Sequence, residues 1–119
     1  MDRDQFPIFH NIDKLRIATI NRKIEWTKSN PTTYISKVAE QYVVSIQSVL
    51  LKKDFTDYEL LIFRENEDIP CFSSKKEKDP NLSLAMYHKH LKFLYDSIKK
   101  SVEDKGLDAL QSVVDFIDD

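Results

Sequence analysis

The chain of 119 residues contains a single glycine, Gly106. Glycine is the residue that most readily adopts a positive φ, which tight hairpins and phosphate-binding loops use heavily. The glycine-dependent motifs of Walker loops, dinucleotide-binding turns and nucleophile elbows are therefore absent. Many-stranded sandwiches and barrels are disfavoured for the same reason. We expect mainly helices joined by polar loops.

The clearest helical pattern covers residues 82–104. Asp79 is placed to cap this helix, and Pro80 would occupy its first position. Gly106 follows as the residue that would end it in the left-handed C′ conformation. An apolar row with a four-residue repeat, as on one face of a helix, contains Leu82, Met86, His90, Leu94, Ile98 and Val102.

A second helix is predicted from Pro31 to about Lys53. Ser29 or Asn30 would cap it, and Pro31 would begin it. Its apolar face, again stepping by three or four residues, would contain Tyr34, Val38, Tyr42, Ile46 and Val49.

Residues 57–66 are predicted to form a short helix, because Thr56 and Glu59 fit a capping box. The alternative is a hairpin in which residues 58–63 and 69–72 are strands. The turn of that hairpin would lack glycine, and Pro70 would confine its strand to a sheet edge. The helix is therefore preferred.

Residues 15–27 are ambiguous. Ile17, Ile20 and Ile24 cluster on one helical face, whereas the alternation of Leu15, Ile17 and Thr19 is typical of a strand. We favour the helix here as well.

The C-terminal segment is predicted to be a separate amphipathic helix with Leu107, Leu110, Val114 and Ile117 in one row. The fold class predicted from these elements is all-α, a compact bundle of about four or five helices in one domain, residues 1–119. The alternative is α+β, with one or two short hairpins near 15–27 and 58–72. The predicted core contains Ile17, Ile20, Ile24, Val38, Tyr42, Ile46, Val49, Leu61, Leu91, Leu94, Ile98, Leu110 and Val114.

The bulk composition is that of an intracellular globular protein. Hydrophobic residues make up 41% and charged residues 32%, which argues against global disorder. Cys71 is the single cysteine and cannot form an internal disulfide. The N-terminus lacks the apolar run of a signal peptide, and no stretch approaches the roughly 18 apolar residues of a membrane span. We expect a cytoplasmic protein that has no membrane partner.

Three groups of residues are candidate chemical sites. His88 and His90 form an H-x-H pair, but two residues advance about 200° around a helix, so the rings would diverge. Cys71 has no histidine at a motif-defining distance. The acidic cluster at 65–68 lacks the pattern of a calcium loop. We therefore predict no catalytic, cofactor-binding or metal-binding residue, no cofactor and no enzymatic activity.

Charge is distributed in blocks, although the net charge is only -2. Residues 14–53 and 69–102 are mainly basic, whereas residues 54–68 and 103–119 are mainly acidic. Either the blocks neutralise one another within the fold, or they form separate charged faces that select partners.

The preferred functional hypothesis is a small non-catalytic protein-binding protein: an inhibitor, immunity protein, adaptor or regulatory subunit that uses segregated surface charge. Its partner would be another protein with a charged surface. The partner-binding candidates are Asp57, Glu65, Glu67, Asp68, Asp108, Asp115, Lys89 and Lys92.

Two other hypotheses remain open. One is nucleic-acid binding by the basic block 14–53, with phosphate contacts from Arg16, Arg22, Lys23, Lys28 and Lys37. The other is a metal-dependent enzyme that uses His88, His90, His10 or the acidic cluster at 65–68.

Overall fold

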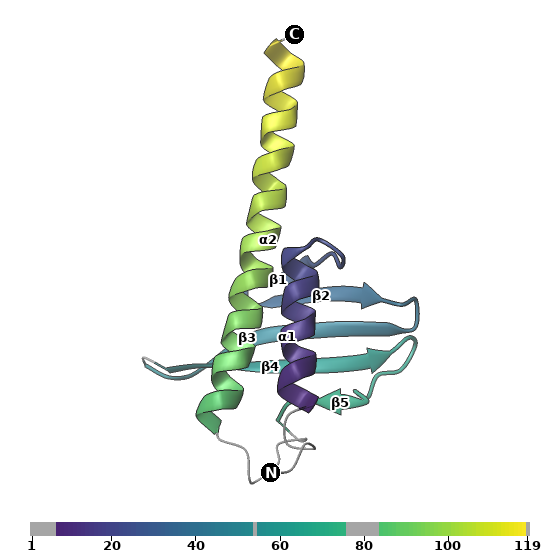
Figure 1. Cartoon of the computed structure of the whole chain (residues 1–119), viewed down its shortest axis with the longest axis vertical. Helices are drawn as coiled ribbons and strands as arrows, with labels where there is room; N and C mark the ends of the chain where they lie inside the picture. The colour runs from purple at the N-terminus through teal and green to yellow at the C-terminus, as the bar shows by residue number, and fades with distance from the viewer. Residues whose placement is uncertain (1–6, 54, 76–83, 119) are drawn as a thin grey trace.

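The fold, seen in a computed structural model, is α+β and consists of a five-stranded antiparallel sheet and two helices (Figure 1). The structure describes residues 7–53, 55–75 and 84–118. The elements in chain order are α1 (Pro7–Ile20), β1 (Thr27–Asn30), β2 (Thr33–Val38), β3 (Tyr42–Lys52), β4 (Phe55–Arg64), β5 (Phe72–Ser73) and α2 (Leu84–Asp118).

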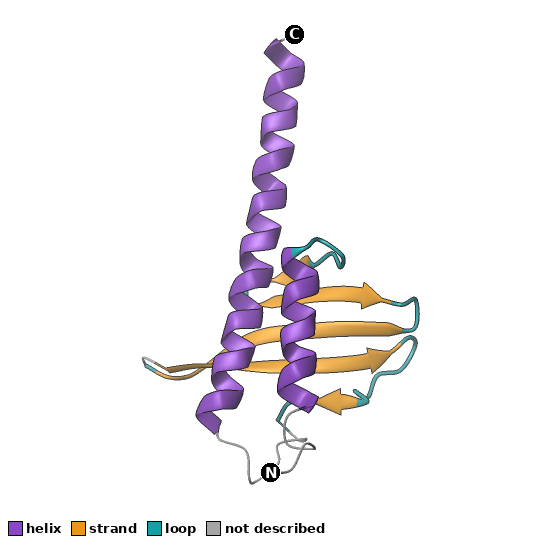
Figure 2. Ribbon diagram, in the orientation of Figure 1, coloured by secondary structure: helices purple, strands orange, loops and turns teal. Residues whose placement is uncertain are grey.

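The strands form a simple meander in the order β1-β2-β3-β4-β5, and every neighbouring pair is antiparallel. Both helices lie on the same face of the sheet, as Figure 2 shows. They run side by side in the same direction: Phe9 of α1 contacts Tyr87 and His90 of α2, and Ile20 lies near Ser97.

The predicted all-α bundle is wrong, and the error arises from the four-residue repeat between residues 34 and 46. Tyr34 pairs with Ile46 across β2 and β3, and both side chains are buried beneath α2. A step of four residues also returns to the same face of a strand, because side chains alternate with a period of two. The repeat therefore could not distinguish a helix from strands, and the dense Val, Ile and Thr of this segment favour strands.

The structure also decides two predictions that left a helix and a hairpin as alternatives, at residues 57–66 and 15–27. Residues 57–66 lie in and just beyond β4, so the predicted helix there is wrong. β4 pairs with β5 in a hairpin, as in the alternative, but the second strand is Phe72–Ser73 and not residues 69–72. A hairpin near 15–27 is absent, since α1 continues to Ile20 and β1 begins only at Thr27. The predicted helix caps Asp79 and Pro80 lie outside the described residues.

Turns form without glycine, which removes the main argument for an all-helical chain. Ala39 and Glu40, between β2 and β3, adopt φ of 57° and 60°. The turn between β1 and β2 uses Asn30, whose Oδ1 accepts a hydrogen bond of 3.0 Å from the Thr32 amide. Asn before Pro31 suits this turn as well as it suits a helix cap, because both use the same side-chain acceptor.

The core lies between the helices and the even-numbered residues of β2, β3 and β4. Tyr95 of α2 packs against Tyr34 and Tyr58, with ring centroids 5.4 Å and 5.1 Å apart. The predicted core residues Ile46, Leu91, Leu94 and Ile98 are buried. Five others are exposed, which contradicts their prediction: Ile17, Ile20, Tyr42, Leu110 and Val114.

Helix α2 passes through Gly106 without a break, so the predicted C′ glycine is wrong. Gly106 does not have a positive φ, and a Cβ at this position would meet no atom within 4 Å. The two helices predicted for 82–104 and for the C-terminal segment are therefore one helix of 35 residues.

Candidate protein-interaction surface

Helix α2 extends well beyond the rest of the fold. Its last part, residues 106–118, is here called the extension, and it projects past the sheet and past α1 (Figure 1). Every residue of the extension is exposed. At about 1.5 Å per residue, these 13 residues add nearly 20 Å of helix. The extension is therefore a helix with no sheet or helix of its own chain beside it among the described residues.

One side of the extension is apolar. Successive residues advance by about 100°, so Leu107, Leu110, Val114 and Ile117 fall into a single row, here called the apolar row. Their exposed fractions are 63%, 58%, 41% and 72%. Val113 lies beside the row and is also exposed. Large aliphatic side chains in one contiguous row on a surface are characteristic of a contact site for another macromolecule.

The opposite side of the extension is acidic. Asp108 and Asp115 lie one to two positions from each apolar residue in sequence, but they project to the other side of the helix. Asp115 accepts a hydrogen bond of 2.8 Å from Gln111 Nε2. The extension thus separates apolar from acidic groups, as an amphipathic recognition helix does.

The row changes character where α2 leaves the domain. From Leu107 toward the N-terminus, the same three- and four-residue steps along this side of α2 reach Lys92, Asp96, Lys99 and Glu103, which are all exposed. From Lys92 to Ile117 this side of α2 faces solvent, and it is charged beside the domain and apolar beyond it. The apolar row is therefore not a continuation of the face that packs on the sheet.

Two ion pairs and a small cavity lie at the base of the extension. Arg22 Nη2 is 3.2 Å from Asp108 Oδ2, and Lys105 Nζ is 3.6 Å from Glu25 Oε2. The cavity has a volume of about 250 Å³ and is lined by Arg22, Ile24, Glu25, Trp26, Ser101, Val102, Lys105 and Asp108. This cavity is large enough for one apolar side chain.

Trp26 gives the cavity a fixed apolar wall. Its ring is buried, and Nε1 donates a hydrogen bond of 2.9 Å to Thr19 Oγ1. Thr19 Oγ1 in turn donates to the Leu15 carbonyl of α1 at 2.8 Å. Trp26 directly precedes β1, so its indole links the start of the sheet to α1 near the base of the extension.

The partner-binding candidates predicted from the sequence do not form one site. Asp108 and Asp115 lie on the extension, whereas Glu65, Glu67 and Asp68 lie in the segment after β4. Glu65 pairs with Lys37 at 2.9 Å. The acidic and basic blocks thus neutralise one another in part, since this pair and that of Arg22 with Asp108 both join different blocks.

The remaining candidates are held in local contacts. Asp57 of β4 is half-buried and lies 3.6 Å from His88. Lys89 lies over the Phe93 ring, and Lys92 donates to Asp96 at 2.7 Å. That hydrogen bond raises the pKa of Lys92.

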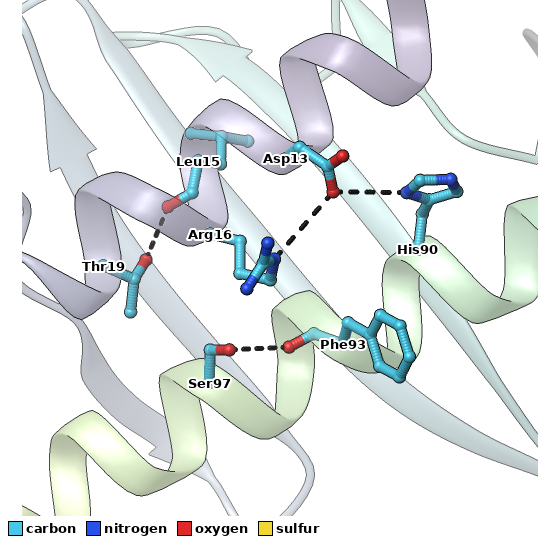
Figure 3. A network of polar contacts seen from close by, with 7 residues as sticks. All are labelled: Asp13, Leu15, Arg16, Thr19, His90, Phe93 and Ser97. Carbon is cyan, nitrogen blue, oxygen red and sulfur yellow. Dashed lines mark hydrogen bonds and ion pairs between the residues drawn. The ribbon is translucent and has the colours of Figure 1, made fainter.

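The two histidines of α2 diverge, as the helical spacing predicts. His90 stacks on Phe9 and lies 3.2 Å from Asp13 of α1, whereas His88 packs beside Phe55 on β4. Figure 3 shows Asp13 between His90 and Arg16, and the contact of Asp13 with His90 joins α1 to α2. Within the described ranges, no group of three or more His, Cys, Asp or Glu side chains is placed to hold a metal ion.

Burial raises the pKa of two core tyrosines. For Tyr58 the Asp96 carboxylate adds to the effect, and for Tyr34 the nearby Tyr95 does so. Both hydroxyls belong to the packed layer between α2 and the sheet, so these shifts describe the core and not a reactive centre.

The second face of the sheet is also uncovered by the described helices. It carries apolar and polar side chains in mixture: Ile35, Ser45 and Leu61 share one cross-strand row. Gln47 Nε2 donates to Glu59 Oε1 at 2.8 Å in the adjoining row. Antiparallel sheets commonly leave one such face to water. Its apolar groups are half-buried and interrupted, unlike those of the extension.

The comparisons with family models, curated proteins and solved structures find no match for this chain. No helix of the described segments has the length and apolar character needed to cross a membrane.

The sequence revealed the apolar row but not its exposure. Leu110 and Val114 were predicted to be core residues, because an amphipathic helix in a small domain normally packs on that domain. The one available signal was the length of the pattern: helical periodicity runs from residue 84 to residue 118 once Gly106 is allowed inside the helix. A helix of that length exceeds the span of the sheet.

Proposed function

We propose that this chain is a small non-catalytic protein-binding protein and that the extension of α2 is its main recognition element. The observation that supports the proposal is the exposure of the apolar row, at 41% to 72% for its four residues. The acidic side of the same helix would select the charge of the partner.

The energetics of helix formation favour a partner for the extension. The extension continues the packed part of α2 and needs no nucleation, but most helical stability in proteins comes from the packing of an apolar face, which the extension lacks within its own chain. The extension has 13 residues and contains Gly106, which lowers helix propensity by about 1 kcal/mol relative to alanine. Burial of the apolar row against a partner would supply the stabilisation that its own chain does not.

The charge distribution defines the kind of partner that fits. Asp115 and Asp108 present carboxylates on the side opposite the apolar row, and Asp104 precedes them. A partner surface with an apolar groove and a basic rim would complement this helix, in the manner of amphipathic helices bound in grooves. Rim charges of this kind mainly accelerate and select association.

The proposal is tested with three matched baits: the wild-type chain, Leu110→Glu and Ser112→Glu. Both variants add one carboxylate to an exposed position of the extension, but Ser112 lies away from the apolar row. We expect a different protein of the source organism to bind the wild type and Ser112→Glu in stoichiometric amount at low salt. Leu110→Glu should lose at least tenfold in affinity for that protein, once it is purified and the complex is reconstituted.

A second variant tests the role of charge. Asp115→Lys should weaken the reconstituted complex and reduce its dependence on salt, because one complementary contact is lost. The proposal fails if no stoichiometric partner is found, or if the partner binds all of these variants with equal affinity.

A further inference from the structure

We propose that the apolar row also pairs with the same row of a second copy of this chain, forming a short parallel two-stranded coiled coil. This inference deepens the proposed function and rests on its use of the extension as a contact element. The row follows steps of three, four and three residues from Leu107 to Ile117. These steps assign Leu107 and Val114 to position a and Leu110 and Ile117 to position d of a heptad.

The charges of the extension allow two identical helices to approach each other. Asp108 and Asp115 occupy position b, which points away from a coiled-coil seam. The flanking positions e and g next to the seam contain the uncharged Gln111 and Val113 and, at the last turn, Asp118, which in a parallel pair lies near Val113 of the other copy. Self-pairing therefore removes apolar side chains from water and leaves the acidic sides on the outside. Because both contacts use the same apolar row, self-pairing and the binding of a groove partner exclude each other.

Two charged residues that precede the apolar row in α2 favour a parallel pair of helices. Lys99 is at position g and Asp104 at position e of the next heptad. In a parallel pair these positions face each other between the two chains, so Lys99 of each copy lies near Asp104 of the other. An antiparallel pair with the same four-residue seam would instead bring Asp104 near Asp118 of the other copy, which is unfavourable.

The seam is short, and this determines the strength of the dimer. Positions a and d of the preceding heptad are Lys100 and Glu103, so the apolar contact begins only at Leu107. Two heptads bury less than the roughly 1,200 Å² of a stable protein–protein interface. The dimer is therefore weak and in rapid exchange, and it is populated only at high protein concentration.

Sedimentation equilibrium of the full chain tests the pairing. As the concentration rises from low micromolar to several hundred micromolar, the weight-average mass should increase from 14.0 kDa toward twice that value. Leu110→Glu should remain at 14.0 kDa throughout, whereas Ser112→Glu should follow the wild type. Equal melting temperatures of the three proteins at low concentration establish that the fold is intact.

Cysteine cross-linking tests the direction. In a Cys71→Ser background, Val114→Cys places a thiol at a position that faces itself in a parallel pair. A chemical oxidant should then remove the two thiol hydrogens and yield a disulfide-linked dimer, while Ser112→Cys in the same background should cross-link at least tenfold more slowly.

Each outcome separates this inference from the proposed function. A wild-type mass that stays at 14.0 kDa overturns self-pairing, even if a different protein still binds in a Leu110-dependent manner. A mass of three or four chains overturns the two-stranded arrangement. A dimer in which Val114→Cys fails to cross-link overturns the parallel direction.

Discussion

The two halves of α2 have nearly the same amphipathic character and opposite environments. In the first half, Leu91, Leu94 and Ile98 are buried against α1 and the sheet. In the second half, Leu110 and Val114 have similar spacing and are exposed. An apolar row thus indicates that a helix is suited to packing, but not whether the surface that packs on it belongs to the same chain.

The largest expected effect comes from placing the same charge in each half. Leu94→Asp should prevent folding or cost at least about 4 kcal/mol, because Leu94 is fully buried and the carboxylate would have no partner. Leu110→Asp should change the free energy of unfolding by less than about 0.5 kcal/mol, as for other exposed positions. Urea denaturation followed by circular dichroism at low protein concentration measures both. Equal destabilisation by the two variants would contradict the contrast.

A smaller effect is expected at the junction between the halves. Gly106→Ala should increase the helicity of the extension, with a gain of up to about 1 kcal/mol in local helix propensity. The added Cβ meets no atom within 4 Å, so no clash opposes the gain. Far-ultraviolet circular dichroism should show more helix in the variant than in the wild type. A loss of helix would instead indicate that Gly106 ends the helix with a positive φ.

The core that packs against the first half of α2 should respond to alkaline pH. The raised pKa values of Tyr34 and Tyr58 favour their neutral forms in the folded state. Their contribution to stability is complete below the unfolded-state pKa of about 10 and is lost as the pH rises through the folded values. The melting temperature should therefore fall above pH 10, and Tyr58→Phe should reduce that fall. A wild-type melting temperature that stays constant to higher pH would contradict the burial of these hydroxyls.

The smallest effect is expected for the ion pairs at the base of the extension. Arg22→Ala removes the 3.2 Å contact with Asp108, but both side chains are largely exposed. Such pairs contribute about 0 to 1 kcal/mol and are screened by salt. Urea unfolding at low and high salt should show a difference of this size that shrinks with salt. A loss of several kcal/mol would mean that the pair anchors the extension to the domain.

The sequence allowed the first half of α2 to be predicted, because its buried residues occur at odd and even steps that only a helix places together. Leu91, Leu94, Tyr95 and Ile98 cannot share one face of a strand. The residues of β2 and β3 follow even steps, which helix and strand share. Their misassignment was reinforced by the lack of glycine, although Ala39 and Glu40 adopt positive φ in the hairpin.

The candidate interaction surface was predictable only in part. The acidic residues Asp108 and Asp115 were recognised as candidates for partner binding, and both lie on the extension. The apolar row beside them was assigned to the core, since sequence periodicity carries no information about the size of the sheet that a helix must cover. The acidic residues after β4 belong to a different end of the fold, and only the chain topology separates them from the extension.

Amide hydrogen exchange along α2, measured at a low and a high concentration of the wild-type chain, tests the central claim most directly. At low concentration, residues 91–98 should exchange only with global unfolding, whereas residues 107–117 should exchange rapidly through local fraying. Raising the concentration should slow exchange in residues 107–117 alone. Strong and equal protection of both segments at the lowest concentration would show that the extension already packs within its own chain, and would contradict the account.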